Sequence, residues 1–259
     1  MHATNCKVTV RAQDIVAPDI RRLVVAWGEG EPQAFPHAGQ FYMLRAWRAD
    51  EAPLLSRPIS VHDCDPAAKT LTFLYQVKGP GTEKLAALRP GDTMQLTGPC
   101  GNGFDTAAAA AAGRVAVVGG GIGVAPLLLL CKELSAAGPK PELYVGFRDE
   151  PYGLEAFLPY CGAISVATDS GAAGYHGLVT GILHPENFDL VLACGPTPMM
   201  RGVAALCKET GVRCLVSLER KMACGLGACL GCTCQTKVGP RTVCKDGPVF
   251  SAEEVFDLD

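Results

Sequence analysis

Short runs in which hydrophobic and polar positions alternate fill the first hundred residues of the chain. Examples are 7–10, 40–45 and 70–75, and turn residues such as Pro90-Gly91-Asp92 separate them. Successive side chains of a strand face opposite sides, so this period of two predicts strands with one buried face. Several such strands at close spacing predict an antiparallel barrel or sandwich over about residues 6–96.

The pattern changes after a low-complexity run, residues 105–113, which we interpret as a linker with room for a helical turn. Strand-length apolar runs then alternate with helical segments, which is typical of a parallel α/β sheet. The runs are 114–118, 142–146, 163–167, 189–193 and 213–217. The last of these is expected to be the final strand. Beyond residue 218 the chain is rich in cysteine and glycine and has little periodicity, so we expect something other than a hydrophobic core to organise it.

Composition and charge narrow the class of protein. The 259 residues are 48% hydrophobic, enough for two ordinary domains and a small appendage. A formal net charge of -3 gives no general attraction for nucleic acid or an anionic membrane. The N-terminus lacks the features of a signal peptide, and no apolar run approaches the roughly 20 residues of a membrane-spanning helix. We therefore expect a soluble, cytoplasmic protein without nucleic-acid or membrane partners.

The 13 cysteines are unevenly distributed, because five of them fall between Cys224 and Cys244. Cys224, Cys229 and Cys232 are separated by four and then two residues, and Cys244 follows after eleven more. This is the plant-type ferredoxin spacing, in which four thiolates hold a [2Fe–2S] cluster. Small residues between the cysteines allow the backbone to approach the sulfurs closely. The sequence therefore predicts a cluster held by these four thiolates.

Other interpretations of this segment stay open at this point. A four-cysteine zinc site usually contains two C-x-x-C pairs, whereas here only Cys229 and Cys232 form one. Unligated structural thiols are not expected to gather so closely in a cytoplasmic chain. Cys234 could in principle replace Cys232, but only Cys232 preserves the four-and-two spacing.

Two segments of the predicted barrel are together suited to bind a flavin nucleotide. Each is a weak signal alone, because an Arg-Pro pair can be a turn and Gly-Pro-Gly-Thr a hairpin and helix cap. Arg57-Pro58-Ile59-Ser60 offers a guanidinium that can pair with a pyrophosphate through two hydrogen bonds. Gly81 and Thr82 stand where a helix over 82–88 is predicted to begin, with Thr82 as its N-cap. Backbone N–H groups and a hydroxyl at a helix N-terminus favour a phosphate. The segment Leu74-Tyr75-Gln76 would form the strand that flanks the flavin ring.

A further glycine-rich segment, Gly119-Gly120-Gly121-Ile122-Gly123, follows a predicted strand and opens a predicted helix. A dinucleotide-binding loop requires this context, although the motif is not the Rossmann G-x-G-x-x-G. The structural alternative is a tight turn that needs glycine only for packing. After the strand 142–146, Asp149 or Glu150 would favour the free 2′-hydroxyl of NAD, whereas Arg148 could accept the 2′-phosphate of NADP.

The order of these motifs resembles that of a known family. Arg-Pro-x-Ser, Gly-Pro-Gly-Thr, Gly-Gly-Gly-Ile-Gly-x-Ala-Pro, Cys-Gly-Pro-x-Pro-Met and the cysteine segment follow one another along nearly the whole chain. Together they are similar to the ferredoxin-reductase superfamily, and within it to the electron-transfer subunits of NAD-dependent class 1B dihydroorotate dehydrogenases. The most specific part is 219–250. The wider superfamily has an aromatic residue where this chain has Ile59, and that difference matches the narrower family.

The resemblance implies three domains and places the nicotinamide. They are an antiparallel FAD-binding barrel over 1–104, a parallel-sheet NAD-binding domain over 113–217 and a small [2Fe–2S] domain over 218–259. It brings the turn Gly119–Gly123 close to the pyrophosphate of NAD, and the segment Cys194-Gly195-Pro196 close to the nicotinamide. The preference for NAD over NADP rests on this resemblance.

The resemblance also implies an electron route and a partner. Dihydroorotate is oxidised in a separate FMN-containing catalytic subunit, and electrons pass through the cluster to FAD and then to NAD+, in pyrimidine (UMP) biosynthesis. FAD suits this place because flavins exchange both electron pairs and single electrons. The chain is too short to contain a (β/α)8 barrel of ~250 residues besides its own parts. We therefore expect a partner subunit, with the cluster segment at or near the contact, and no catalytic acid or base in this chain. The resemblance implies a heterotetramer of two plus two subunits.

Two alternative functions share these motifs. One is the small FAD and [2Fe–2S] subunit of an NAD(P)H–ferredoxin oxidoreductase or of a hydrogenase-type complex. The other is a non-enzymatic redox sensor whose signal is loss of the cluster. The four-cysteine set and the Arg-Pro-Ile-Ser form favour the pyrimidine pathway, and bound FAD would separate both enzymatic functions from the sensor.

Overall fold

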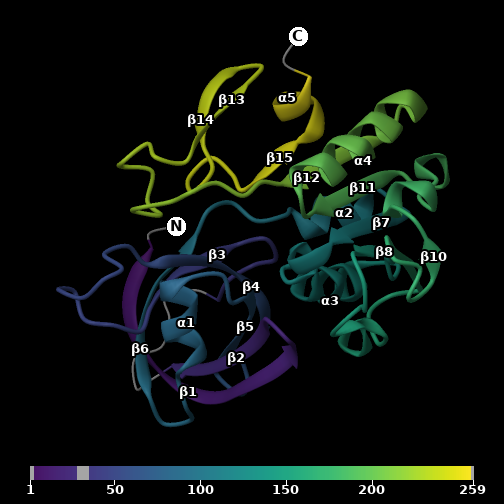
Figure 1. Cartoon of the computed structure of the whole chain (residues 1–259). Coiled ribbons are helices and arrows are strands. Elements are labelled where there is room, and N and C mark those ends of the chain that lie inside the picture. The colour runs from purple at the N-terminus through teal and green to yellow at the C-terminus, as the bar shows by residue number, and fades with distance from the viewer. Residues whose placement is uncertain (1–2, 28–34, 258–259) are drawn as a thin grey trace.

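The N-terminal part of the computed structural model, which describes residues 3–27 and 35–257, is a closed antiparallel barrel (Figure 1). Its strand order is β1-β2-β5-β4-β3-β6. The strands are β1 (Thr4–Ala17), β2 (Ile20–Trp27), β3 (Phe41–Arg45), β4 (Arg57–Asp65), β5 (Thr70–Gln76) and β6 (Thr93–Cys100). Fully buried side chains such as Leu23, Leu71, Phe73 and Leu96 fill the interior. The prediction of an antiparallel barrel or sandwich is confirmed, in the barrel form.

A short helix, α1 (Pro80–Ala86), follows β5 and begins earlier than the sequence predicts. Its N-cap is Gly79, so the prediction that Thr82 caps the helix was wrong. Pro80 occupies the first helical position, where its fixed φ is already suited to a helix. The Thr82 hydroxyl still serves the helix start, because it accepts hydrogen bonds from the N–H groups of Lys78 (2.8 Å) and Gly79 (3.2 Å).

The segment interpreted as a linker is folded. It forms α2 (Thr106–Ala111), whose N-cap Asp105 accepts a hydrogen bond from the N–H of Ala108 at 3.0 Å. The alanine run was taken for low-complexity chain, but alanine has the highest helix propensity of all residues. The helix is also held by tertiary contact, since the Thr106 hydroxyl donates to Glu133 at 3.1 Å.

The second part of the chain is a seven-stranded sheet of order β10-β9-β8-β7-β11-β12-β15, parallel except for β15. All residues of its central strands β7 and β11 are buried, as expected for a parallel sheet covered by helices on both faces. The strands are β7 (Val115–Gly120), β8 (Glu142–Phe147), β9 (Ala163–Thr168), β10 (Tyr175–His176), β11 (Leu190–Cys194) and β12 (Arg213–Ser217). The predicted α/β sheet is confirmed.

Helices connect the strands of this sheet. The single turn η1 (Gly121–Val124) and the helix α3 (Leu127–Ala137) follow β7, and α4 (Thr197–Thr210) follows β11. Three further short turns are η2 (Leu154–Phe157), η3 (Val179–Gly181) and η4 (Pro185–Asn187). Figure 1 shows α3 on the side of the sheet that faces the barrel. This arrangement brings the start of α3 close to the barrel strands that carry the flavin segment.

The C-terminal segment adds elements that the sequence did not predict. A hairpin of β13 (Thr233–Thr236) and β14 (Gly239–Thr242) precedes β15 (Val249–Ser251) and α5 (Ala252–Phe256). Strand β15 pairs antiparallel with β12, so the run 213–217 is not the last strand of the sheet as expected. The N–H of Asn102 also donates to the carbonyl of Gly247 at 2.6 Å. The segment is therefore tied to both the sheet and the end of the barrel.

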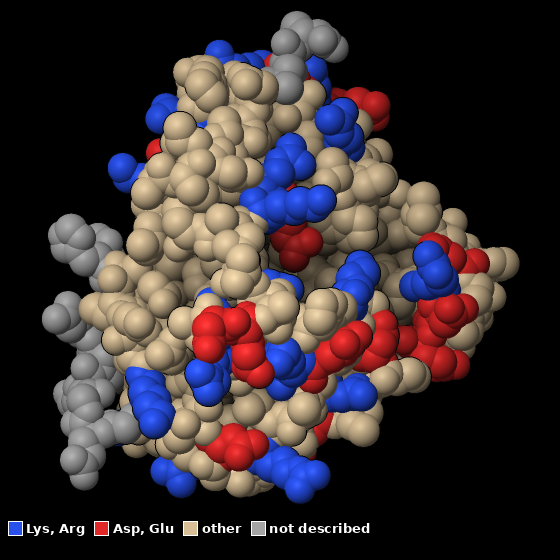
Figure 2. All heavy atoms as spheres, turned by 60° about the vertical axis from the view of Figure 1, so that its left-hand side comes forward, with Lys and Arg blue, Asp and Glu red and all other residues tan. Residues whose placement is uncertain are grey.

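The surface carries charges of both signs. Figure 2 shows Lys and Arg interspersed with Asp and Glu on one face, which is hollowed near its centre. Such a face produces no extended field of one sign. Within residues 3–27 and 35–257, no helix has the length and apolar character needed to cross a bilayer.

Leu130 of α3 provides a test of the packing between helix and sheet. Its side chain is 0% exposed, whereas Leu158 is 65% exposed. We expect Leu130→Ala to lower the free energy of unfolding by about 2–5 kcal/mol, because it removes buried methyl groups and leaves a cavity. Leu158→Ala should change it by about 0.5 kcal/mol or less. Urea unfolding of the full chain, followed by circular dichroism, measures both; equal losses would contradict the assignment of Leu130 to the core.

Candidate flavin, nicotinamide and cluster sites

Arg57, the first residue of β4, lies beside the start of α1. A Cβ atom added to Gly81 would come within 2.4 Å of Arg57 Nε, so the guanidinium occupies the space that glycine leaves open. The same guanidinium lies 5.7 Å from the ring centre of Trp47 and donates to the carbonyl of Leu55 at 2.6 Å. The two segments expected to bind the flavin pyrophosphate are thus brought together. A guanidinium beside the first turn of a helix fits a pyrophosphate.

Trp47 is a residue of this site that the sequence analysis missed. Its ring is 8% exposed and lies near two guanidinium groups, those of Arg45 at 5.6 Å and Arg57 at 5.7 Å. Aromatic faces attract guanidinium groups, so Trp47 helps to hold Arg57 in place. An isolated tryptophan between two arginines in the sequence carries no spacing that would have identified it.

The other predicted flavin residues lie on two adjacent strands. Pro58, Ile59 and Ser60 continue β4, and all three are partly exposed. Leu74 and Tyr75 of β5 are only 4% and 2% exposed, which leaves their side chains little surface for a cofactor. The Gln76 side chain donates to Asp19 at the edge of the barrel. The edge of β4 is therefore the more accessible of the two predicted surfaces.

The two segments expected to bind NAD meet at the carboxyl edge of the sheet. Cys194 at the end of β11 is in register with Gly119 of β7. A Cβ atom on Gly123 would lie 2.4 Å from Gly195 Cα, so the two loops touch through their backbones. In open α/β sheets ligands bind at this carboxyl edge. The geometry therefore agrees with the expected position of a dinucleotide.

Cys194 is buried and neutral. Its thiol contacts the side chain of Ser217, the residue beside it on β12, and burial together with the nearby Glu219 charge raises the pKa of Cys194 to about 12. A thiol in this state is a poor nucleophile. Ser217 and Glu219 are further neighbours of the predicted site that the sequence analysis missed, because cross-strand register was not available from the sequence.

Backbone N–H groups donate to the sulfurs of three of the four predicted cluster ligands, Cys224, Cys232 and Cys244. Leu226 and Cys229 donate to Cys224 Sγ at 3.3 and 3.5 Å, and Gly227 donates to Cys244 Sγ at 3.1 Å. The N–H of Cys244 donates to Cys232 Sγ at 3.4 Å. Such donors stabilise negative charge on thiolates and on a cluster.

The four thiols lie in two pairs, Cys224 with Cys229 and Cys232 with Cys244. In the part of the chain that the structure describes, no three Cys, His, Asp or Glu side chains gather as ligands of a single metal ion. A two-iron cluster spreads its four thiolates over two irons, whereas a structural zinc binds all four at one point. The paired arrangement fits the [2Fe–2S] cluster better than zinc.

The pKa values of Cys224 and Cys244 are shifted in opposite directions. Burial opposes ionisation of Cys224, but hydrogen bonds from the N–H groups of Leu226 and Cys229 outweigh it and lower its pKa to about 6. Burial and the adjacent Cys232 thiol raise the pKa of Cys244 to about 12. Cys234, the competing candidate, lies on β13 with a side chain that is 5% exposed, and burial raises its pKa. The donor set thus includes a thiol that already favours the ligating form.

The cluster segment packs on the barrel close to the flavin segment. Gly225, next to Cys224, has a φ of +71°, and a Cβ atom there would lie 2.6 Å from Met43 Cγ. Met43 of β3 is paired with Pro58 of β4. Only one strand therefore separates the cluster loop from Arg57 and its neighbours.

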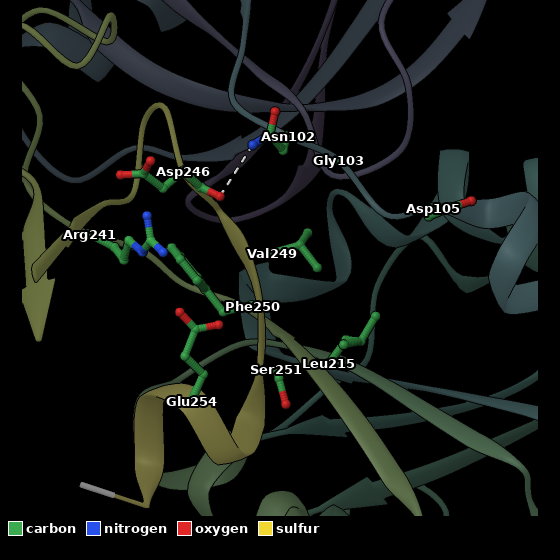
Figure 3. Close-up of a pocket in the computed structure, with 10 residues that line it drawn as sticks. All are labelled: Asn102, Gly103, Asp105, Leu215, Arg241, Asp246, Val249, Phe250, Ser251 and Glu254. Atoms are coloured by element: carbon green, nitrogen blue, oxygen red, sulfur yellow. Dashed lines mark hydrogen bonds between the residues drawn. The ribbon is translucent and has the colours of Figure 1, made fainter. Parts of the chain in front are cut away.

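A shallow cavity of about 470 Å³ lies where the end of the barrel, the sheet and the C-terminal segment meet (Figure 3). Arg241, Phe250 and Glu254 line one side, and the Asn102 amide on the other side donates to the carbonyl of Asp246 at 3.3 Å. None of the predicted site residues lines it. The cavity is a seam between the parts of the chain, and its wall includes Asp246, two residues after Cys244.

A closed barrel, a parallel sheet with a glycine turn and a four-cysteine segment define a protein of the ferredoxin-reductase class that carries an iron–sulfur domain. A chain from the structure of an NADH-dependent reduced ferredoxin–NADP oxidoreductase superposes with a TM-score of 0.81 at 27% identity, over 96% of this chain and 89% of that one. Residues 219–256 match the iron-sulfur cluster binding domain of dihydroorotate dehydrogenase B.

Curated relatives identify the family within this class. The dihydroorotate dehydrogenase B (NAD(+)) electron transfer subunit of Clostridium acetobutylicum is 45% identical over 88% of this chain and 89% of its own length. That of Caldanaerobacter subterraneus subsp. tengcongensis is 39% identical over 96% of this chain and 98% of its own length. The chain belongs to the family of dihydroorotate dehydrogenase B electron transfer subunits, as the resemblance indicates.

The space beside Arg57 provides a test of the flavin site. Gly81→Ala would place a Cβ atom 2.4 Å from Arg57 Nε, whereas a Cβ on Gly79 would meet nothing within 4 Å. The Arg57 guanidinium, as the end of a flexible side chain, is expected to move rather than unfold the protein. We therefore expect Gly81→Ala to lower the affinity for FAD by about tenfold, as for loss of a charge-assisted hydrogen bond, and Gly79→Ala to leave it unchanged. Fluorescence titration of FAD into the apoprotein measures the affinities, and equal values would exclude Arg57 from the site.

Proposed function

We propose that this chain passes electrons from an FMN-containing, dihydroorotate-oxidising subunit to NAD+ in pyrimidine biosynthesis. The observation that carries the proposal is the packing of the four-cysteine loop on β3, next to the strand that begins with Arg57. An electron relay needs its carriers close together and held by fixed elements. The names of the curated relatives and the matched iron-sulfur cluster binding domain support the same function.

Each part of the chain has a separate task in this function. Arg57, held by Trp47, would bind the FAD pyrophosphate together with Gly81 and Thr82. The turn Gly119–Gly123 and the adjoining Cys194-Gly195-Pro196 would hold NAD at the carboxyl edge of the sheet. When bound, FAD exchanges electron pairs with NAD and single electrons with an iron–sulfur cluster.

In the cluster segment, Cys224, Cys229, Cys232 and Cys244 would be the ligands. N–H groups of the loop, such as those of Leu226 and Gly227, donate to their sulfurs and stabilise the negative charge of the cluster. Cys234 belongs to the β13–β14 hairpin, so we propose that it packs beside the cluster without ligating it. These assignments account for both the spacing in the sequence and the two thiol pairs.

The alternative oxidoreductase function is less well supported. The solved structure of an NADH-dependent ferredoxin–NADP oxidoreductase shares 27% identity, whereas the curated relatives reach 39–45% over most of the chain. The redox-sensor alternative would not require the Arg57 site or the glycine turn. Because the residues of both candidate sites lie together, we favour an enzymatic electron carrier.

Exposed apolar side chains on the cluster loop indicate where the partner subunit binds. Leu226 and Leu230 are 51% and 63% exposed and flank Cys229. Apolar side chains that gather at an exposed functional loop are typical of protein interaction sites. We propose that the catalytic subunit docks on this loop, in a cytoplasmic heterotetramer of two plus two chains, which would also shield the cluster from solvent.

Spectra of the anaerobically purified chain test the function and the ligand set together. Titration with NADH should bleach the flavin bands and produce the rhombic EPR signal of a reduced [2Fe–2S] cluster. Cys232→Ser should remove most of the iron and this signal, because it removes one of four ligands, whereas Cys234→Ser should retain both. A colourless, zinc-containing protein would contradict the proposed function, and the opposite behaviour of the two variants would make Cys234 the ligand.

The docking surface is tested by charge substitutions. We expect the double variant Leu226→Glu and Leu230→Glu to weaken capture of the catalytic subunit by at least about tenfold, because it would bury two carboxylates in an apolar contact. Ile15→Glu is the control, since Ile15 is 73% exposed but lies on β1 of the barrel. Surface plasmon resonance with the immobilised partner measures the affinity, and iron content verifies that the cluster is retained. An unchanged affinity in the double variant would show that the catalytic subunit binds at another surface.

A further inference from the structure

Strand β4 contains a β-bulge immediately after the flavin segment. Val61 is paired with Phe73, but Asp63 is paired with Thr72, so His62 is an extra residue without its own partner on β5. Bulges change the direction of side chains and often re-aim them beside functional sites. Here the bulge directs two consecutive side chains, those of His62 and Asp63, to the α/β part of the chain.

Both side chains contact the segment that begins with the glycine turn. His62 Nδ1 lies 2.6 Å from the carbonyl oxygen of Ala125, and the residue is 6% exposed. Asp63 forms an ion pair with Lys132 of α3 at 2.6 Å, with both side chains 27% exposed. One buried hydrogen bond and one half-buried ion pair thus join neighbouring positions of β4 to η1 and α3.

The Ala125 carbonyl needs a donor from outside its own helix. Pro126 is the N-cap of α3, and its carbonyl accepts the first hydrogen bond of that helix. The Ala125 carbonyl lies one residue earlier, so α3 provides no donor for it. Ala125 is 3% exposed, which excludes water as a ready partner. Leaving a buried carbonyl unpaired costs about 1–3 kcal/mol. His62 satisfies this group from across the boundary between barrel and sheet.

The ring of His62 is suited to act as a neutral donor. Burial lowers its pKa, while the Ala125 carbonyl and the Asp63 carboxylate oppose that shift, and the charges of Arg22 and Lys132 add to it. A neutral imidazole carries one N–H, and because Nδ1 faces a carbonyl we assign the proton to that atom. The hydrogen bond is then formed without burial of a charge.

We propose that His62 is a positioning residue for electron transfer between NAD and the flavin. It lies two residues after Ser60 of the flavin segment, and Ala125 lies two residues after Gly123 of the glycine turn. The bond between them fixes the turn expected at the NAD pyrophosphate relative to the flavin-binding strand. The same turn touches Gly195, in the loop expected at the nicotinamide. Reaction rates depend strongly on such alignment, since a misplacement of about 1 Å can cost a hundredfold. The inference rests on the proposed function, because it presumes that both nucleotides bind at these two segments.

Two substitutions of His62 test its hydrogen bond to the Ala125 carbonyl separately from the packing of the side chain. His62→Asn places an amide N–H near the position of Nδ1 and should preserve it, whereas His62→Leu removes the donor at nearly the same volume. In stopped-flow reduction of the FAD- and cluster-loaded chain by NADH, we expect His62→Leu to slow flavin reduction about tenfold to a hundredfold at saturating NADH, by loss of alignment. His62→Asn should stay within about threefold of the wild type, and FAD content should not change in either variant.

Lys132→Met is the control for a merely structural role. It breaks the neighbouring ion pair at the same boundary but leaves the Ala125 carbonyl paired. We expect it to lower the melting temperature of the loaded chain and to leave the rate of flavin reduction within about threefold of the wild type. Equal slowing by Lys132→Met and His62→Leu would overturn the proposal, as would unchanged reduction in His62→Leu.

Hydrogen exchange provides a readout that does not depend on electron transfer. In the loaded chain without NADH, the amides of 119–125 should exchange faster in His62→Leu than in the wild type, His62→Asn or Lys132→Met. If His62→Leu does not fold, His62→Gln serves instead, because its longer side chain moves the amide away from the Nδ1 position. Unchanged exchange at 119–125 would overturn the proposal. If NADH does not reduce the wild-type chain, the proposed function is refuted instead. The comparison of hydrogen exchange at 119–125 would then still test the bond between His62 and Ala125.

Discussion

The boundary between the barrel and the parallel sheet determines how the flavin and nicotinamide segments face each other. Neither the barrel nor the sheet alone fixes that relation, because each closes its own hydrogen-bond network. Apolar side chains pack across this boundary, and polar contacts made by α3 add direction to it. Lys132 pairs with Asp63, the Glu133 carboxylate accepts from the N–H of Ala38 at 3.1 Å, and the carbonyl before the helix is bound by His62. Of these contacts, the His62 bond is the one that reaches the glycine turn itself, whereas the Lys132 ion pair holds the helix that follows it.

Around the cysteine segment the controlling interaction is different. Here backbone N–H groups point at sulfur atoms, and glycine residues let the loop lie directly on β3. The loop has few apolar side chains of its own to bury, so its conformation depends on these hydrogen bonds, and a bound cluster would reinforce it. The same loop presents two exposed leucines, which makes its outer surface suited to a protein partner while its inner surface faces the barrel.

Much of this arrangement could be predicted from the sequence because its signals are local. The alternation in 70–75 predicts a strand of the barrel, and the apolar run 114–118 predicts a strand of the parallel sheet. The four-and-two cysteine spacing predicts the cluster loop. What failed depended on contacts between distant residues. The alanine run was taken for a linker although Glu133 holds it as a helix, and β15 was missed because three residues become a strand only by pairing with β12.

The candidate binding sites show the same difference between local sequence signals and contacts between distant residues. Arg57 and Gly81 were each weak signals, and their proximity appears only when the barrel closes. Trp47 and Ser217 could not have been identified, because nothing in their sequence neighbourhood marks them and their roles come from a cation–π contact and from strand register. Local patterns therefore predict which segments are candidates for binding, whereas the fold reveals which side chains would orient them.

The pairing of β15 with β12 makes the iron–sulfur segment inseparable from the sheet that precedes it. A chain cut after Ser217 would lose more than its cluster, because the N–H and C=O groups along β12 would become an open sheet edge. Such an edge is a template for association between chains. The C-terminal segment thus acts as a built-in protection against aggregation, and it could not be exchanged between proteins as an independent module without a substitute strand.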